Sequence, residues 1–149
     1  EAKLWVIPAV RMKMKKEHKC PLSSAAIALI EELPQIEGNP HLFVGAKKGK
    51  PICDAMMRLF LHADKKKRGL GYPDISVHGF RSTFRDWGAE TTMFPRELCE
   101  LALAHDVRSE VELAYQRGDM LDKRRTLMQA WSDYIDNQIK DIGDVDNLV

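Results

Sequence analysis

The sequence predicts a mainly α-helical domain with a small antiparallel β-sheet near its N-terminus, which is an α+β fold. Apolar residues recur at spacings of three and four along most of the chain, which is the period of an amphipathic helix. The clearest β-prone runs lie within the first 22 residues and flank a charged stretch, as in a hairpin. With 149 residues, of which 44% are hydrophobic, the chain suits one compact domain and is not disordered in composition.

The predicted hairpin joins residues 4–7 (LWVI), a β-prone run that Pro8 closes, to a second short strand at residues 20–22 (CPL). The chain between the two strands forms a basic tip. Five cations belong to this hairpin: Arg11, Lys13, Lys15, Lys16 and Lys19.

Two helices and a third strand are predicted in the middle of the chain. Ser23 can cap a helix that continues until Pro34. Residues 42–44 (LFV) predict a third short strand. Pro51 suits a first helical position and opens the next helix. The buried stripe expected on that helix consists of Met56, Leu59, Phe60 and Ala63.

The second half of the chain is predicted to be helical. A helix that starts near His78 would bury Phe80, Phe84 and Trp87 on one side and end at Gly88. Pro95 opens the following helix, with Leu98 and Leu101 facing inward. We expect a short helix from the capping-box pair Ser109 and Glu112, and a last helix from about Leu121 with the apolar seam Leu127, Trp131, Ile135 and Ile139. The domain is expected to span residues 1–140, and residues 141–149 to form an acidic, mobile tail.

The charge is divided unevenly along the chain, although the net charge is only +1. Residues 1–85 contain 16 Lys and Arg against 8 Asp and Glu, whereas residues 86–149 contain 7 against 14. A protein that grips a polyanion on one side shows this asymmetry, and an ordinary solvated surface explains it equally well. The candidate contacts to a DNA backbone are Arg11, Lys15, Lys16, Lys47 and Lys48.

Two other features of the sequence limit the class of protein to which it can belong. No apolar run approaches the roughly 20 residues of a membrane-spanning helix. Three cysteines without paired spacing indicate neither a disulfide framework nor a zinc site. We expect a protein of a reducing cytoplasm.

Three local patterns carry reactive side chains. His78 and Arg81 form H-x-x-R and lie on one face of a first helical turn, where they can converge on an anion such as a phosphate. His105 follows a helix in the pattern L-x-H, Tyr115 lies ten positions later, and Lys13 lies near the hairpin tip. Each pattern alone is explained more simply by a capping histidine, a structural histidine, a packed tyrosine or an exposed lysine.

Taken in order, the hairpin lysine, H-x-x-R, L-x-H and the tyrosine resemble the tyrosine recombinase family, specifically the phage and genomic-island integrases. The likeness extends from about Trp5 to Tyr134. It includes WVIPA at residues 5–9, KMK at 13–15, PLS at 21–23, HGFRSTF at 78–84 and MQAW at 128–131. Four ordered motifs are far more specific than any single one. The resemblance implies the catalytic-domain fold of that family.

The resemblance also implies DNA strand exchange through a 3′-phosphotyrosine intermediate. Tyr115 would be the nucleophile, and His78 would accept its proton, because tyrosine is mostly protonated at neutral pH. Arg81 and His105 would stabilise the charge on the pentavalent phosphate. Lys13 would protonate the departing 5′-oxygen. Because the intermediate conserves the phosphodiester bond energy, no ATP, cofactor or metal is implied.

The sequence departs from the family pattern in one respect. Family members carry a first catalytic arginine ahead of the strand that here begins at Leu4, and a separate DNA-binding domain, and neither is found in these 149 residues. We therefore expect a fragment truncated on the N-terminal side of the catalytic domain, which binds DNA weakly and hardly cleaves it. The full-length protein would act on double-stranded DNA in the bacterial cytoplasm, as a tetramer on two duplexes.

Two other function classes stay open. The dipeptide His105-Asp106, with His62 and His78 as further ligands, suggests a metal-dependent phosphohydrolase of the HD type, although no residue clearly completes its coordination sphere. A non-catalytic helical DNA-binding module would bind the DNA backbone through its basic face, and the motifs would then be incidental.

Overall fold

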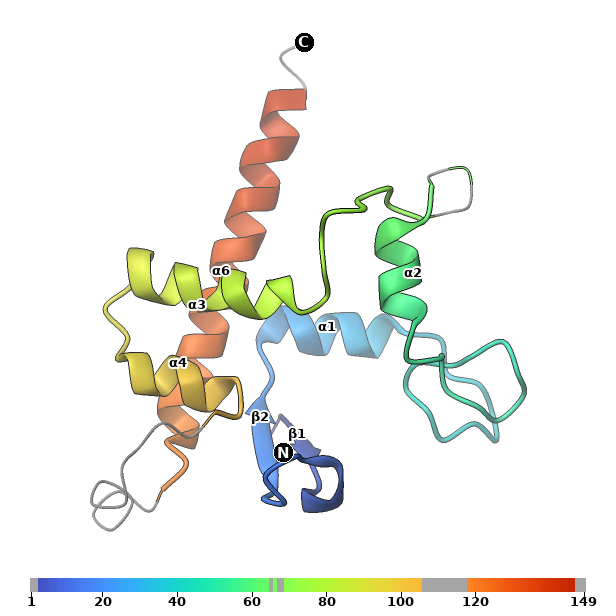
Figure 1. Cartoon of the computed structure of the whole chain (residues 1–149), viewed down its shortest axis with the longest axis horizontal. Coiled ribbons are helices and arrows are strands. Elements are labelled where there is room, and N and C mark those ends of the chain that lie inside the picture. Colours follow the sequence, from blue (N-terminus) through green and yellow to red (C-terminus); the bar gives the residue numbers. More distant parts are fainter. Residues whose placement is uncertain (1–2, 65, 67–68, 106–117, 147–149) are drawn as a thin grey trace. The chain divides into compact units, whose positions relative to one another are not determined.

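Helices make up most of the described chain, and a two-stranded antiparallel sheet lies near the N-terminus (Figure 1), which confirms the predicted fold class. The computed structural model describes residues 3–64, 66, 69–105 and 118–146. The elements are β1 (Leu4–Ile7), the 3-10 helix η1 (Ala9–Arg11), β2 (His18–Pro21), α1 (Ser24–Glu32), α2 (Met56–His62), α3 (Gly79–Thr91), α4 (Arg96–Ala102) and α6 (Leu121–Asp146).

The chain divides into two units, which are described separately. Unit 1 consists of residues 1–28 and 87–149, and unit 2 consists of residues 29–86. Within the described ranges, no helix combines the length and apolar character that crossing a membrane requires.

The predicted hairpin is confirmed in unit 1. β1 and β2 pair antiparallel, with Leu4 opposite Pro21 and Ile7 opposite His18. The second strand starts two residues earlier than predicted, at His18. Pro8 ends β1 because it has no N–H to donate to the ladder, and the chain then turns through η1 into the basic tip.

A reciprocal pair of hydrogen bonds joins the start of α1 to α6. The Ser23 hydroxyl accepts a hydrogen bond from the Ala26 N–H at 3.2 Å, as the predicted cap requires. The Ser24 N–H donates to Gln129 Oε1 at 2.9 Å, and Gln129 Nε2 donates to Ser24 Oγ at 3.0 Å. Hydrogen bonds in unit 1 therefore join two segments that lie 105 residues apart in the sequence.

The core of unit 1 forms where α4 packs on α6. Leu98 and Leu127 are almost fully buried, as predicted. Trp87 and Trp131 lie with ring centroids 5.0 Å apart, and Tyr134 stacks on Trp131 at 5.7 Å. Aromatic pairs at these distances add to the stability that burial supplies.

The apolar seam of α6 is buried only in its first half. Leu127 is fully buried, whereas Ile135 and Ile139 are 37% and 62% exposed. The helix continues to Asp146 and so includes most of the predicted tail.

α3 differs from its prediction at both ends. Phe84 is buried, but Phe80 is 50% exposed, so the predicted stripe is wrong in its first turn. The helix runs past Gly88 to Thr91. A Cβ at Gly88 would lie 2.9 Å from Cys99 Sγ, so the glycine permits the close approach of α4 and does not end the helix.

The third strand predicted in unit 2 is reduced to a single bridge between Val44 and Pro51. Pro51 cannot donate a backbone hydrogen bond, and a longer ladder does not form. The same bridge corrects the predicted start of α2. The Ile52 N–H donates to Phe43 O at 3.0 Å, so the residues at Pro51 and Ile52 pair with the chain at Phe43 and Val44 and are not helical. α2 therefore begins only at Met56.

The predicted stripe of α2 is also wrong. Leu61 is its buried residue, whereas Leu59 and Phe60 are about half exposed. The chain that follows turns back on the helix, where Leu70 N–H donates to Phe60 O and Tyr72 N–H donates to Leu61 O, both at 2.8 Å. The side of α2 that is buried is therefore the side that this following chain covers.

Candidate functional site

A cleft of about 530 Å³ lies in unit 1 beside the hairpin. The hairpin tip lines it with Met12, Met14 and Lys16, and the chain after α4 contributes His105. Arg124, from the first turn of α6, also lines the cleft. The fold thus brings the hairpin tip that carries Lys13 and the predicted phosphate ligand His105 to a single cavity. These two residues lie about ninety positions apart in the sequence.

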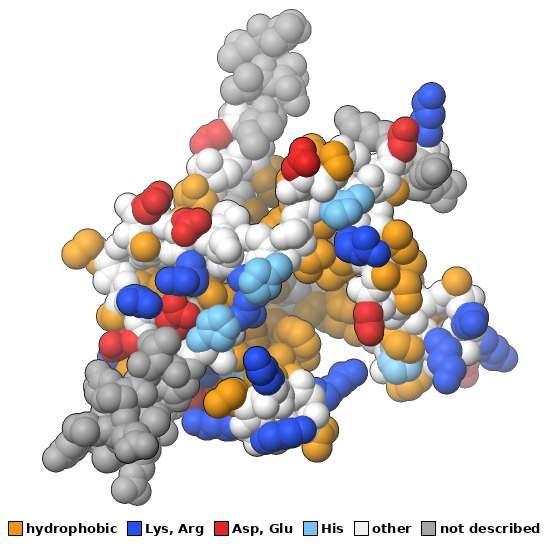
Figure 2. Space-filling view, in the orientation of Figure 1, with side chains coloured by type: hydrophobic (Ala, Val, Ile, Leu, Met, Phe, Trp, Pro, Cys, Tyr) orange, Lys and Arg blue, Asp and Glu red, His pale blue; other side chains and the backbone are white. Residues whose placement is uncertain are grey.

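Lys13 lies between the two lining methionines, and its side chain is exposed. It is not itself a lining residue. A lysine carries its ammonium on a long flexible stem, which suits a group that moves onto a substrate. Lys and Arg side chains gather over this tip (Figure 2). The predicted backbone contacts Arg11, Lys15 and Lys16 are exposed there.

His105 is placed by the turn that ends α4. Ala104 adopts a left-handed backbone conformation with φ 60°, and the His105 N–H donates to Glu100 O at 2.8 Å. This turn satisfies a carbonyl at the end of the helix. The histidine therefore points to the cleft because of the backbone of α4, as the position after a helix predicts.

Glu100 holds the His105 ring. Its Oε2 lies 3.1 Å from His105 Nδ1, and its other oxygen lies 4.0 Å from Arg96 Nε. Glu100 is only 4% exposed. Because a carboxylate can only accept, Nδ1 carries the hydrogen in this contact. Glu100 was not predicted as a site residue, because its one signal in the sequence is its place five residues before a histidine that follows a helix.

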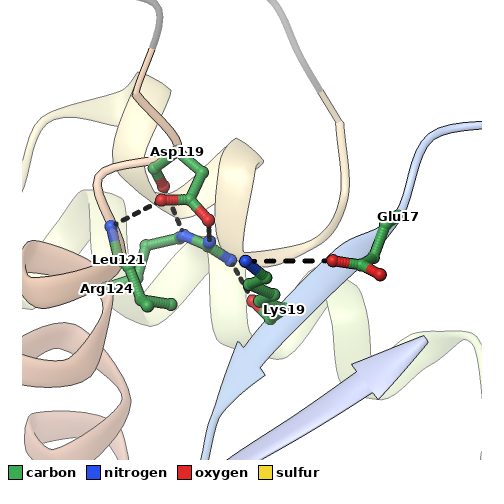
Figure 3. A network of polar contacts seen from close by, with 5 residues as sticks. All are labelled: Glu17, Lys19, Asp119, Leu121 and Arg124. Atoms are coloured by element: carbon green, nitrogen blue, oxygen red, sulfur yellow. Dashed lines mark hydrogen bonds and ion pairs between the residues drawn. The ribbon is translucent and has the colours of Figure 1, made fainter. Parts of the chain in front are cut away.

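Arg124 is the most deeply buried charged residue in the described part of the chain, at 1% exposure. Nε donates to Asp119 O at 2.8 Å, Nη1 donates to Lys19 O at 2.7 Å, and Nη2 lies 3.2 Å from Asp119 Oδ2 (Figure 3). Burial lowers the pKa of Arg124, and the Asp119 carboxylate opposes that change. Arg124 was not predicted as a site residue, because its position in the sequence resembles that of an ordinary surface cation.

Unit 2 holds the other predicted pair at the start of α3. His78 is exposed just before the helix, and Arg81 is half-buried in its first turn. The Arg81 N–H donates to His78 O at 3.0 Å, and the Ser76 hydroxyl accepts from the Gly79 N–H at 2.9 Å. The H-x-x-R motif thus opens a capped helix, as predicted.

The remaining predicted positions fall in two places. Lys47 and Lys48 are exposed in the loop that the bridge between Val44 and Pro51 closes. Tyr115 and the predicted short helix around it lie outside the described residues, as does Asp106.

The described residues lend no support to a metal site. Among them, no three His, Cys, Asp or Glu side chains are grouped so that they could hold a metal ion. His62, proposed as a ligand in the HD-type alternative, has Nε2 2.8 Å from Ile75 O.

The sequence matches the phage integrase family over residues 1–120. It is 38% identical to the prophage integrase IntA of Escherichia coli K12, over 88% of this chain and 31% of that protein. It is 33% identical to the integrases of Enterobacteria phage P4 and Shigella phage Sf6, over 89% and 94% of this chain and 33% and 36% of those proteins. The chain thus spans about a third of the length of these relatives. No solved structure matches it.

Proposed function

This chain belongs to the phage integrase family, and we propose on that premise that it supplies the later part of a catalytic centre that cuts and rejoins double-stranded DNA. The observation that carries the proposal is the cleft of unit 1. It is lined by His105 and by Met12 and Met14, the residues on either side of Lys13 in the sequence. A DNA backbone is the substrate that suits a cavity beside an exposed basic tip.

The proposed reaction is a transesterification at one backbone phosphorus atom. The Tyr115 oxygen forms a bond to phosphorus while the bond from phosphorus to the 5′-oxygen breaks. His78 takes the tyrosine proton, and Lys13 gives a proton to the departing 5′-oxygen. Rejoining runs the same steps in reverse, so the number of phosphodiester bonds is conserved and site-specific recombination needs no outside energy source.

Arg81 and His105 are proposed to stabilise the pentavalent phosphate. A guanidinium can donate two parallel hydrogen bonds to its oxygens. For His105, the proton on Nδ1 faces Glu100, so only the protonated ring offers a second N–H, at Nε2, to the phosphate. The contact with Glu100 orients the ring and leaves Nε2 available to the phosphate.

Cleavage by the 149 residues alone is expected to be slow, and the complete enzyme is proposed to act as a tetramer on two duplexes. Removing one charge-stabilising donor from such a site costs about 100- to 1,000-fold in rate. This expectation assumes that the first catalytic arginine of the family lies outside these residues.

A suicide substrate tests the proposal. We would offer a pool of duplexes that are nicked beside the cleavage position, with randomised flanking sequence, so that the short 5′-hydroxyl strand diffuses away and traps the adduct. Slow formation of a covalent adduct is expected, with the DNA located on Tyr115 by mass spectrometry. Tyr115→Phe should abolish the adduct and leave noncovalent affinity unchanged, and the exposed Tyr72→Phe is the matched control.

Each alternative predicts a different result. DNA binding without any adduct would favour the non-catalytic DNA-binding module. An adduct that survives Tyr115→Phe would contradict the assigned nucleophile. Activity that disappears in excess EDTA would favour the metal-dependent alternative. Rapid, efficient trapping by these residues alone would contradict the expectation that they need a further arginine.

A further inference from the structure

Arg124 makes contacts that a helix-surface arginine does not need. A buried guanidinium must be fully hydrogen-bonded to offset the loss of water. Here its three nitrogens engage Asp119 O, Asp119 Oδ2 and Lys19 O at 2.7 to 3.2 Å. The planar fork of an arginine can reach three acceptors at once, which a lysine ammonium cannot do in the same geometry.

Those acceptors belong to two segments that the proposed reaction uses. Lys19 lies in β2, the strand that returns from the tip carrying Lys13. Asp119 follows Tyr115 by four residues and also accepts the Leu121 N–H at 3.2 Å, at the start of α6. One side chain therefore ties the strand behind the proposed general acid to the chain that follows the proposed nucleophile.

We propose that Arg124 is a positioning residue that holds the Lys13 hairpin in register with the cleft. This inference rests on the proposed function. An isolated two-stranded hairpin is only marginally stable in water, so the position of its tip depends on what anchors its strands. A general acid must lie within hydrogen-bond reach of the leaving oxygen, and a small misplacement costs a large factor in rate.

Two substitutions separate the contacts. Arg124→Lys keeps the charge but loses the fork. Asp119→Asn removes the ion pair while leaving the bond to Lys19 O in place. Lys123→Gln, at the exposed neighbouring position, is the control.

Amide hydrogen exchange on the 149-residue chain tests the anchoring directly. In Arg124→Lys, the protection of the β1 and β2 amides should fall about tenfold, the effect of losing one hydrogen bond to a charged group, while α4 and the first half of α6 keep theirs. Asp119→Asn should have a smaller effect and Lys123→Gln none. Unchanged hairpin protection, or an equal loss everywhere, would overturn the anchoring role.

A substrate with sulfur in place of the bridging 5′-oxygen tests the link to Lys13. The bond from phosphorus to sulfur breaks to release a thiolate, which is a weak base and needs no general acid. Arg124→Lys should slow covalent capture about tenfold or more on the oxygen substrate and recover most of that loss on the sulfur substrate, as Lys13→Ala should. Equal losses on both substrates would show that Arg124 does not act through Lys13.

The two experiments separate the failure of this inference from that of the proposed function. If the unaltered chain forms no adduct with either substrate, the proposed function fails and the positioning role falls with it, while hydrogen exchange still decides whether Arg124 anchors the hairpin. If the adduct forms but the sulfur substrate rescues only Lys13→Ala, the proposed function stands and the role of Arg124 is wrong.

Discussion

Glu100 is a nearly buried carboxylate whose described partners are Arg96 and the ring of His105. A carboxylate at 4% exposure is costly unless it is paired, and these two contacts help to offset that cost. The contact at 3.1 Å also fixes which ring nitrogen carries the hydrogen. The orientation of the His105 ring thus depends on a residue outside the recombinase motifs.

Glu100→Gln should lower covalent capture about tenfold, because an amide keeps the shape of the side chain but can donate as well as accept, so it no longer fixes the hydrogen on Nδ1 of His105. The suicide substrate measures the effect, and Glu97→Gln in the same helix is the control. Nitrogen-15 spectra of the His105 ring check the cause. The hydrogen should prefer Nδ1 in the unaltered chain and lose that preference in Glu100→Ala. A ring spectrum identical in both would contradict this role.

Predictability at this scale depends on whether a residue acts through a local pattern. His105 could be predicted because L-x-H follows a helix, and the cleft contains it. Arg124 could not, because its partner Lys19 is 105 residues away and no spacing in the sequence indicates that pairing. The catalytic roles stay predictions for all five residues, namely Lys13, His78, Arg81, His105 and Tyr115.

Among the elements, the end of α4 controls how His105 is presented. Ala104 takes φ 60°, where a Cβ crowds the following carbonyl and costs about 1–2 kcal/mol. Glycine would remove that cost, although it gives the unfolded chain more freedom. Ala104→Gly is therefore expected to raise the free energy of unfolding by about 0.5–1 kcal/mol in urea titrations.

Ala102→Gly provides the comparison, because residue 102 is the last residue of α4 and belongs to the helix. There glycine should lower the free energy of unfolding by about 0.5–1 kcal/mol. Equal destabilisation by both substitutions would show that the turn does not require a left-handed residue at position 104.

Elements fixed by their own end signals were predictable, and those decided by tertiary contacts were not. Pro8 ends β1 and Ser23 caps α1 as the sequence indicates. Gly88, by contrast, is a helix breaker by propensity, yet its packing against Cys99 keeps it inside α3. Pro51 suits a helix start in isolation, but its bridge to Val44 prevents one.

In the described part of the chain, groups of exposed cations lie on the hairpin tip of unit 1 and in the loop of residues 45–50 in unit 2. Each cation that neutralises a DNA phosphate should add about 0.9 to the slope of log affinity against log salt. Replacing Lys15 and Lys16 together by glutamine should reduce that slope by about 2, and replacing Lys47 and Lys48 should do the same.

Fluorescence anisotropy across a salt series measures the slopes. The exposed Lys123 and Lys140 of α6, replaced together by glutamine, should leave the slope unchanged. A slope that responds equally to every pair would mean that binding is not localised to the basic tip and loop.

The discontinuity of unit 1 has a consequence for synthesis on the ribosome. Its opening 28 residues emerge first, yet their partners on α6 are translated about a hundred codons later. Until Arg124 and Gln129 leave the exit tunnel, the nascent hairpin and the first turn of α1 lack these hydrogen bonds. Translation that stops before α6 would thus release a polypeptide whose hairpin is not anchored in this way, and proteases should cleave such a product readily.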